Sequence, residues 1–369
     1  MARITLNGIQ HRYPGAPDAT LKGIDLVIND GEAHALLGGS GAGKTTLLNV
    51  LSGLSEAFAG EICFDSKVVR FGERRNVAQV FQFPVLYEGL DVRGNLEFAL
   101  KNAGWKRGAR HERVADIAAK LEIADLLNRR PKDLTLFQKQ LVAIGKALVR
   151  PDIALVLLDE PLTAVAPATK WRLRVMLKRI QRSLGMTMIY VTHDQTEALT
   201  FADRISVMDA GAIIQTDTAQ ALYERPLHEH VGYFIGSPGM SFLNTRVQDN
   251  QLWLADTLLG STDAAPGLYK LGFRPEWARI VPLNDDHDIV LTVERTRIEH
   301  SDRGVPFGLM NAVCDGERLH TRQQLNEVGS VTLPAQAALK IDIARCSLYR
   351  DGWRVDGLLG GLLDGHAVG

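Results

Sequence analysis

Hydrophobic residues in the first part of the chain, residues 1 to about 235, follow two alternating patterns. One is the uninterrupted apolar run, as in Ile153–Leu158 and Met188–Val191, which is typical of a strand buried on both faces of a sheet. The other is helical spacing, as in Lys170–Leu184, where Gly185 is placed to end the helix. Strand, helix and strand in this order predict an α/β domain with a parallel sheet.

The pattern changes twice along the chain. From about 88 to 150 helical spacing dominates, for example over Arg113–Leu127, and predicts a helical subdomain inserted into the α/β domain. Gly and Pro in residues 236–243 break both periodicities and predict a linker. Short strand patterns then predict a small all-β, barrel-like second domain over 236–369. These strands are expected at Gln251–Ala255, Leu268–Phe273, Ile289–Val293, Val331–Leu333, Leu339–Ile343 and Trp353–Val355.

Length and charge restrict the class of protein. A chain of 369 residues is long enough for two or three domains at about 150 residues each. Its 42 Lys and Arg against 43 Asp and Glu disfavour a protein that mainly covers nucleic-acid phosphates. No apolar run approaches the roughly 18 residues that span a bilayer, the N-terminus lacks a secretory pattern, and three scattered cysteines indicate a reducing compartment. We therefore expect a cytoplasmic protein.

The most specific motif is a glycine-rich loop, Gly38-Gly39-Ser40-Gly41-Ala42-Gly43-Lys44-Thr45. It fits G-x-x-x-x-G-K-[ST] and lies between an expected strand at Ala33–Leu37 and an expected helix at Thr46–Leu54. Backbone N–H groups of such a loop surround phosphate oxygens, while Lys44 reaches the β- and γ-phosphates and the Thr45 hydroxyl binds Mg²⁺. A glycine-rich turn without a ligand is the alternative, and the strand and helix on either side disfavour it.

Polar residues end two of the expected buried strands. Asp159 and Glu160 follow one of them, at the edge where ligands bind in α/β sheets, so Asp159 can hold Mg²⁺ and Glu160 can act as a general base. His193 follows the next strand and can orient or sense the γ-phosphate. Without the loop, the two carboxylates would be interpreted as the end of a strand. Because the loop lies beside them, a functional role is favoured. For the histidine, a structural role remains the alternative.

Three further features have weaker signals. Gln82 closes another expected strand, where its amide can contact water or Mg²⁺. The apolar segment Phe83–Tyr87 can pack as a core loop or form an exposed groove for a partner's helix. Tyr13 lies among polar residues, where it can stack on an adenine ring or be an ordinary edge-strand tyrosine.

Taken in order, these residues resemble the ATP-binding subunits of ABC transporters. Tyr13 matches the adenine-stacking position, residues 38–45 the Walker A loop, Gln82 the Q-loop, Asp159 and Glu160 the Walker B pair, and His193 the switch histidine. The resemblance implies ATP and Mg²⁺ as ligands. It implies nucleotide contacts from Tyr13, residues 38–45, Thr46, Gln82 and Asp159, and metal ligands among Thr45, Gln82 and Asp159. Lys44, Gln82, Glu160 and His193 are the implied catalytic residues.

The second domain narrows the resemblance. Phe234–Leu243 looks like the domain junction of carbohydrate importers of the maltose and glycerol-3-phosphate type, and Leu271–Glu276 looks like the G-x-R-P-E turn of their OB-like regulatory domain. The segments Arg75–Pro84 and Ala198–Asp203 are most similar to an ATPase of a glycerol importer that has two different ATPase subunits.

Two segments depart from the family pattern. The family carries L-S-G-G-Q where this chain has Leu134 followed by Thr135, Leu136, Phe137 and Gln138, and S-A-L-D where it has residues 163–166, Thr-Ala-Val-Ala. Glycine allows a close backbone approach to the partner's γ-phosphate, and Leu136 and Phe137 should obstruct it. A heterodimer with a second ATPase of intact signature is therefore expected; a working homodimer, kept active by Thr135 and backbone shifts, stays open.

The expected function is the ATP-hydrolysing subunit of an importer for a sugar, polyol or glycerol-like solute. The resemblance implies two transmembrane permease subunits and, indirectly, a solute-binding protein as partners, no nucleic acid, and a peripheral place on the cytoplasmic face of the bacterial inner membrane. Two alternatives remain. One is a soluble ABC ATPase that acts on ribosomes or DNA, which near-neutral charge and a single ATPase domain disfavour. The other is a catalytically idle regulatory subunit, which the altered signature favours and Glu160 and His193 oppose.

Overall fold

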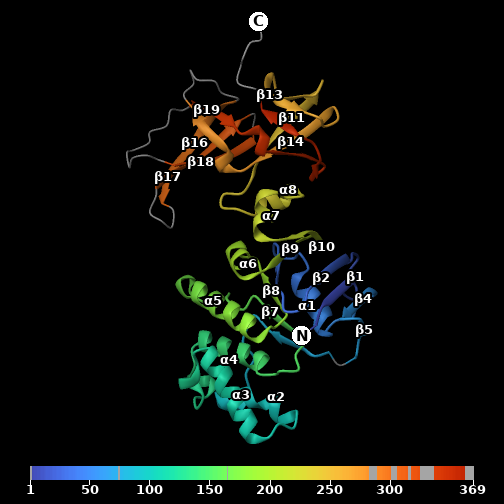
Figure 1. Ribbon diagram of the computed structural model, residues 1–369, viewed down its shortest axis with the longest axis vertical. Helices are drawn as coiled ribbons and strands as arrows, with labels where there is room; N and C mark the ends of the chain where they lie inside the picture. The colour runs from blue at the N-terminus through green and yellow to red at the C-terminus, as the bar shows by residue number, and fades with distance from the viewer. Residues whose placement is uncertain are drawn as a thin grey trace. The chain divides into compact units, whose positions relative to one another are not determined.

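The computed structural model describes residues 2–73, 75–163, 165–281, 289–300, 306–314, 317–324 and 336–361. The chain forms two compact units, residues 1–219 and 220–369 (Figure 1). Residues 220–235 therefore group with the β-rich second unit, although the sequence places them with the first domain; a functional domain boundary at 235 stays a prediction.

A six-stranded, mostly parallel sheet forms the centre of the first unit, in the order β10-β9-β3-β8-β7-β6. Only β10 runs antiparallel to its neighbour. The residues of β3, β7 and β8 are all buried, as their apolar runs predict. The strands are β3 (Ala33–Leu37), β6 (Val77–Val80), β7 (Leu155–Asp159), β8 (Met188–Thr192), β9 (Arg204–Asp209) and β10 (Ala212–Asp217).

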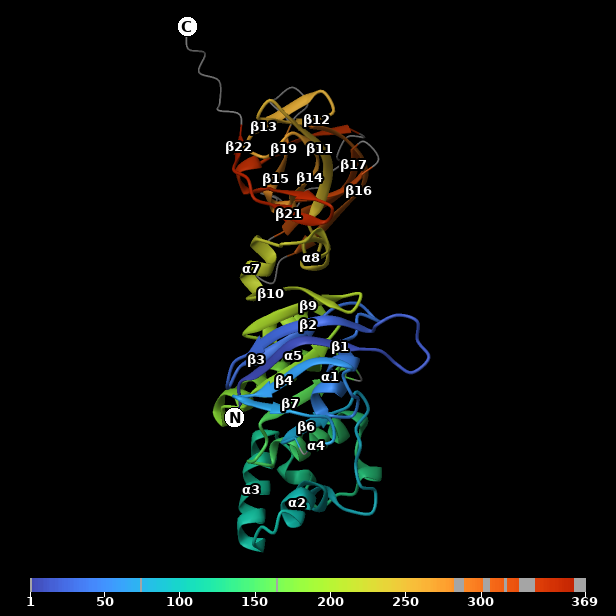
Figure 2. The ribbon, with the colours of Figure 1, turned by 90° about the vertical axis from the view of Figure 1, so that its right-hand side faces the viewer.

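A second, antiparallel sheet, β2-β1-β4-β5, lies beside it in the same unit (Figure 2). Its strands are β1 (Ile4–His11), β2 (Leu21–Ile28), β4 (Ala59–Phe64) and β5 (Lys67–Val69). Apolar residues of both sheets pack with helix α1 (Lys44–Ser52) in one core. The helix begins two residues before the predicted start at Thr46, and it ends where Gly53 takes a left-handed conformation with φ 81°.

Helices cover the rest of this unit. The predicted helical subdomain is confirmed, but the helix expected at Arg113–Leu127 is wrong at both ends. It begins at Arg107 and ends at Lys120, because the chain turns at Glu122, whose φ is 56°. The helices are α2 (Val92–Asn102), α3 (Arg107–Lys120), η1 (Ala124–Leu126), η2 (Pro131–Asp133), α4 (Leu136–Leu148), α5 (Pro167–Leu184) and α6 (Gln195–Phe201). As predicted, Gly185 ends α5 in a left-handed conformation.

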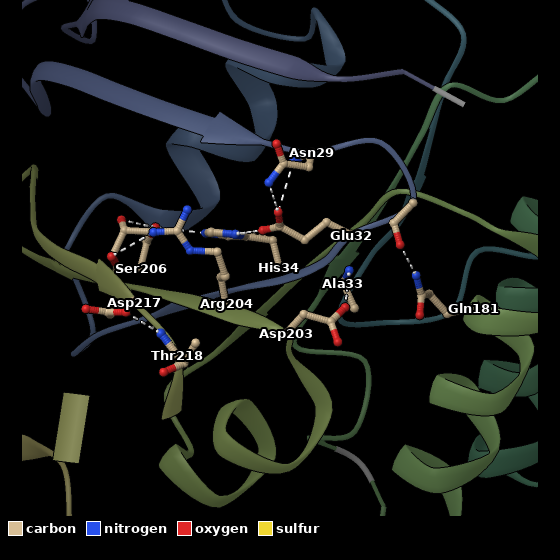
Figure 3. Close-up of polar contacts among 12 residues, drawn as sticks. Asn29, Glu32, Ala33, His34, Gln181, Asp203, Arg204, Ser206, Asp217 and Thr218 are labelled. Carbon is tan, nitrogen blue, oxygen red and sulfur yellow. Dashed lines mark hydrogen bonds and ion pairs between the residues drawn. The ribbon is translucent and has the colours of Figure 1, made fainter. Parts of the chain in front are cut away.

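A buried polar chain fixes the start of β3, the strand that leads into the glycine-rich loop. His34 is fully buried, with Nδ1 2.8 Å from Glu32 Oε1 and Nε2 2.8 Å from Ser206 Oγ. Asn29 donates its side-chain amide to the other Glu32 oxygen at 2.7 Å (Figure 3). Burial holds the pKa of His34 below its usual value. Because every member has a partner, the network fixes β3 against β9 without leaving a buried polar group unsatisfied.

The described residues of the second unit form two short helices and two antiparallel sheets. The helices are α7 (Ala219–Glu224) and α8 (Glu229–Phe234). One sheet has the order β21-β20-β14-β11-β12-β13-β22, with strands β11 (Ser241–Gln248), β12 (Gln251–Leu254), β13 (Thr257–Thr262), β14 (Gly267–Phe273), β20 (Ser347–Arg350), β21 (Trp353–Val355) and β22 (Leu359–Gly361). The other has the order β15-β19-β16-β17-β18, with strands β15 (Ala278–Val281), β16 (Ile289–His300), β17 (Pro306–Cys314), β18 (Glu317–Gln324) and β19 (Gln336–Ile341). Short 3-10 turns are η3 (Pro275–Trp277) and η4 (Ile343–Arg345).

The all-β prediction for this unit is confirmed, with differences in detail. The linker expected at 236–243 is partly strand, because β11 begins at Ser241. Buried and exposed residues alternate along β11, which begins just after the Gly and Pro residues that predicted a linker. The strand expected at Val331–Leu333 lies outside the described residues. Several strands were not anticipated, among them β13 and β20.

The turn at Leu271–Glu276 contains a fully buried arginine. The Arg274 guanidinium donates to the carbonyls of Tyr223, Gly232 and Ile235, and its charge lies over the Tyr223 ring at 4.1 Å from the centroid. Charge-assisted hydrogen bonds of this kind satisfy helix C-terminal carbonyls. Arg274 therefore fastens α7 and α8 to the β-sheets, which explains why they group with the second unit.

Candidate functional site

The glycine-rich loop connects β3 to α1 and is shaped by its glycines. A Cβ on Gly38 would lie 2.2 Å from the backbone oxygen of Met208 on β9, so a larger residue would force the strands apart. Gly41 and Gly43 have φ values of 80° and 98°, in the region that L-residues rarely adopt. The loop thus turns tightly enough to direct backbone N–H groups and the start of α1 toward one point, the arrangement that binds an anion.

Lys44, the first residue of α1, folds back over this loop. Its Nζ donates to Gly38 O at 2.9 Å and to Gly39 O at 2.8 Å, and only 6% of the residue is exposed. Burial lowers the pKa of Lys44, and the nearby charges of Glu160 and Asp159 only partly offset this. A phosphate group in the loop would supply the negative charge that this ammonium group lacks.

Asp159 ends β7 beside Thr45. Thr45 Oγ1 donates to Asp159 Oδ1 at 3.4 Å. Burial and the neighbouring charge of Glu160 raise the pKa of Asp159, against the lowering effects of Thr45 and Lys44. The described residues contain no group of three or more His, Cys, Asp or Glu side chains that could hold a metal ion. A hydroxyl and one carboxylate are nevertheless the few oxygen donors that Mg²⁺ uses when phosphates supply others, so this pair fits the ion.

Glu160 projects from the first residue after β7 in a left-handed conformation, with φ 43°. Its carboxylate lies between two side chains: Oε1 is 3.0 Å from His193 Nδ1, and Oε2 accepts from Thr163 Oγ1 at 3.1 Å. The Glu160 side chain is 21% exposed and that of His193 58%. A carboxylate held in this way, open to solvent on one side, is suited to accept a proton from water.

The other predicted site residues differ in how close they lie to the glycine-rich loop and Asp159. Tyr13 lies outside β1, and its hydroxyl is 3.1 Å from Thr46 Oγ1 on the first turn of α1, with 43% of the residue exposed. Its ring is therefore near the loop and accessible, as adenine stacking requires. Among the described residues, the Gln82 side chain forms no hydrogen bond to the loop or to Asp159. Ser40 is exposed and Ala42 buried within the loop itself.

The altered signature segment forms a closed helix cap. Thr135 Oγ1 accepts from Gln138 N at 3.2 Å, and Gln138 Oε1 accepts from Thr135 N at 2.9 Å. This capping box begins α4. Leu136 is 46% exposed, whereas Phe137 packs against the core. The segment thus presents an isobutyl group where the family has a glycine.

Sequence reasoning missed the side chains that hold the site residues in place. Thr163 bonds to Glu160, and Thr192, Tyr190 and Glu197 form a buried cluster behind His193. One signal was present in the sequence: Asp194 followed three residues later by Glu197 is typical of a helix start, which places Glu197 on the first turn of α6. Ala164, in the departing 163–166 segment, lies outside the described residues.

The ABC transporter family model matches residues 21–163. The chain is 41% identical over 285 residues to an sn-glycerol-3-phosphate import ATP-binding protein of Chromohalobacter salexigens, covering 75% of each chain. It is 37% identical over 325 residues to a second one, of Rhizobium johnstonii, covering 84% of this chain and 87% of the relative. Among solved structures, it resembles cbiO1 of Clostridium perfringens, part of the ABC transporter complex cbiONQ, with TM-score 0.55, 28% identity, and coverage of 58% of this chain and 88% of the other.

The family model and these relatives show an ATP hydrolase. With these relatives, the chain belongs to the ATP-binding subunits of ABC transporters, in the branch of carbohydrate and glycerol-3-phosphate importers. None of the helices formed by the described residues has an apolar stretch long enough to cross a bilayer.

Replacing Asp159 by Asn should stabilise the protein without nucleotide while abolishing magnesium-dependent hydrolysis. The substitution removes a buried charge, a gain of about 1 kcal/mol. Because the pKa of Asp159 is raised in the folded state, the native protein binds more protons than the unfolded chain between the two pKa values. Wild-type stability therefore increases as pH falls through that window and decreases as pH rises through it. The difference in stability between the variant and the wild type should therefore be smaller at acidic pH.

Melting temperatures of both proteins at neutral and at mildly acidic pH measure this effect. Asp209→Asn is the matched control, since Asp209 is exposed at the end of β9 in the same sheet and should show no such difference. An Asp159→Asn variant that melts below the wild type at neutral pH would show that the buried carboxylate is stabilising instead.

Proposed function

We propose that this chain powers the uptake of a sugar, a polyol or a glycerol-like solute, glycerol-3-phosphate included. The observation that carries the proposal is the convergence of Lys44, Asp159, Glu160 and His193 at one edge of the parallel sheet. The relatives named as sn-glycerol-3-phosphate import ATP-binding proteins support an importer over a ribosome- or DNA-acting ATPase.

The proposed reaction is attack of water on the γ-phosphate of ATP. Glu160 accepts the proton of the attacking water, and His193 and Thr163 keep the Glu160 carboxylate in place for it. Lys44 and the N–H groups of residues 38–45 stabilise negative charge on the phosphates. Thr45 and Asp159 would hold Mg²⁺, which neutralises phosphate charge when bound; Gln82 is a further candidate ligand. Tyr13 and Thr46 would contact the nucleotide at the other end of the loop.

Replacing Glu160 by Gln in the assembled transporter should lower the ATPase rate by at least about 100-fold, because the amide cannot accept the proton. ATP binding should be retained, since Lys44 and the loop are unchanged. Steady-state hydrolysis and binding of a fluorescent ATP analogue measure the two effects. An idle regulatory subunit, in contrast, would leave the transporter's rate unchanged by this substitution.

The exposed Leu136, at the position of a family glycine, supports a heterodimer. In this family each ATP lies between one subunit's Walker A loop and the other's signature. A partner with an intact signature would complete the site built on Lys44, Asp159, Glu160 and His193, while the site that includes Leu136 would be weak. The importer would thus contain this chain, a second ATPase and two permeases at the cytoplasmic face of the inner membrane, and would receive solute from a binding protein.

Restoring glycine at the signature tests this arrangement directly. The chain purified alone should turn over ATP slowly, and the double variant Leu136→Gly/Phe137→Gly should be faster by about tenfold or more, because the backbone can then approach the γ-phosphate. Phe137→Leu serves as a control for loss of the Phe137 core contact alone. Fast hydrolysis by the unmodified chain as a homodimer would contradict the heterodimer.

A groove of about 860 Å³ beside the Q-loop supports contact with a permease. It is lined by residues of β6, α2 and α4 together with Phe81, Val85 and Tyr87. Lys146 crosses it, donating to Val85 O at 2.8 Å and lying over the Tyr87 ring at 4.5 Å from the centroid. Val85 remains 62% exposed, so the groove offers an apolar surface to a helix of another chain.

Placing a charge in this groove should uncouple the importer. In Val85→Asp, solute uptake should fall about tenfold or more, because a buried carboxylate disfavours an apolar contact, while nucleotide binding stays within about twofold. Uptake of radiolabelled glycerol by cells that express the complete importer, together with co-purification of the permeases, measures the loss. Val68→Asp, on the exposed strand β5, is the matched control, and equal uptake by both variants would exclude the groove as the contact.

A further inference from the structure

A buried carboxylate lies directly behind the switch histidine. Glu197, on the first turn of α6, is 3% exposed. Its Oε2 accepts from Tyr190 Oη and from Thr192 Oγ1, each at 2.9 Å. Its Oε1 accepts from Lys170 Nζ on α5 at 2.9 Å. One side chain thus connects the end of β8, helix α6 and helix α5.

Thr192 transmits this contact to the residues on both sides of His193. Its hydroxyl donates to Glu197 and accepts from Asp194 N at 3.0 Å, so it bridges across His193. The Asp194 carboxylate then caps α6 through Thr196 N at 2.8 Å and Glu197 N at 3.2 Å. His193 itself is mostly exposed, and the buried turn around it determines where its ring lies.

Lys170 links the same carboxylate to α5, the helix that follows Thr163 along the chain. It lies in the first turns of α5, the helix that follows the segment carrying Thr163, and its backbone N–H donates to Ala166 O at 3.2 Å. His193 Nδ1 and Thr163 Oγ1 contact opposite oxygens of Glu160. Glu197 is thus bonded both to the strand end that precedes His193 and to the helix that follows Thr163, and the bond to Thr192 is the one that leads to His193.

We propose that Glu197 is a positioning residue for ATP hydrolysis, which holds the Thr192–Asp194 turn so that His193 stays in contact with Glu160. This inference rests on the proposed catalytic role of Glu160 and His193. Glu197 is buried and contacts neither Glu160 nor His193 directly; it acts on His193 through Thr192.

The groups that surround the Glu197 carboxylate are hydrogen-bond donors. The Lys170 ammonium is the direct counter-charge, and the buried Arg174 of α5 lies close enough to act on Tyr190. Burial and the charge of Glu197 raise the pKa of Tyr190 well above its usual value, so its hydroxyl stays protonated and donates. Thr192 has a single hydroxyl hydrogen, and a carboxylate is the acceptor that keeps it directed away from His193.

The same two helices offer a control for a merely structural role. Lys178 on α5 pairs with Asp203, just after α6, at 2.7 Å. This pair also joins α5 to the end of α6, but it makes no contact with Thr192 or Glu160. Lys178→Met therefore removes an ion pair of similar length from the same interface without disturbing the His193 turn.

The test uses the assembled transporter and compares Glu197→Gln, Thr192→Val, Thr192→Ser and Lys178→Met. Glu197→Gln and Thr192→Val should each lower kcat by about tenfold with KM for ATP within about twofold. Thr192→Ser keeps the hydroxyl and should retain kcat, and Lys178→Met should leave both values unchanged. In a His193→Ala background, Glu197→Gln should cause no further loss, because its effect passes through the histidine.

Two results would overturn the inference: an equal further loss of kcat in the His193→Ala background, or a Thr192→Val variant with normal kcat. If Glu197→Gln fails to fold, the Thr192 pair alone decides, because valine preserves the size and shape of threonine. Failure of the proposed function is distinguishable, since Glu160→Gln would then leave hydrolysis unchanged in the same assay.

Discussion

The candidate site depends on three adjacent parallel strands, β3, β8 and β7, that end at the same edge. Leu37 pairs with Thr192, and Asp159 pairs with Val191. The residues that follow each strand are consequently brought together: the glycine-rich loop after β3, Glu160 after β7 and His193 after β8. A shift of one residue in either pairing would turn Asp159 or Thr192 to the other face of the sheet.

Polar contacts support this register at the start of β3 and at the end of β8. At the start of β3, His34 is held between Glu32 and Ser206; at the end of β8, Thr192 is held by Glu197. Apolar packing alone tolerates small sliding of buried strands, whereas a buried hydrogen bond with no alternative partner does not. We infer that the two networks give the sheet one register, and the strained backbone of Glu160, with φ 43°, is held in place between them.

The sequence was sufficient to predict the features that depend on residues close together in the chain. The loop, the paired carboxylates and His193 have fixed spacing from buried strands, and β3 was placed correctly at Ala33–Leu37. It did not reveal what His34 or Glu197 does, because their partners lie far away in the chain or act through a third residue: Ser206 is 172 positions from His34. The strand β11 was missed at its start because Gly and Pro just before it obscured the alternation.

In the altered signature, residues that stabilise the start of α4 stand where the family has glycines that contact a partner's nucleotide. Glycines at a helix start cost stability, and their use in this family is to let the backbone approach a partner's nucleotide. Here Thr135 and Gln138 form a complete capping box, Phe137 packs against the core, and Leu136 is exposed. Each of these contacts stabilises α4 in the isolated chain. The family's S-G-G-Q would form the same cap, so the difference lies in Leu136 and Phe137. Their side chains would cost nothing if another ATPase supplies the signature, which is the asymmetric pair that we propose.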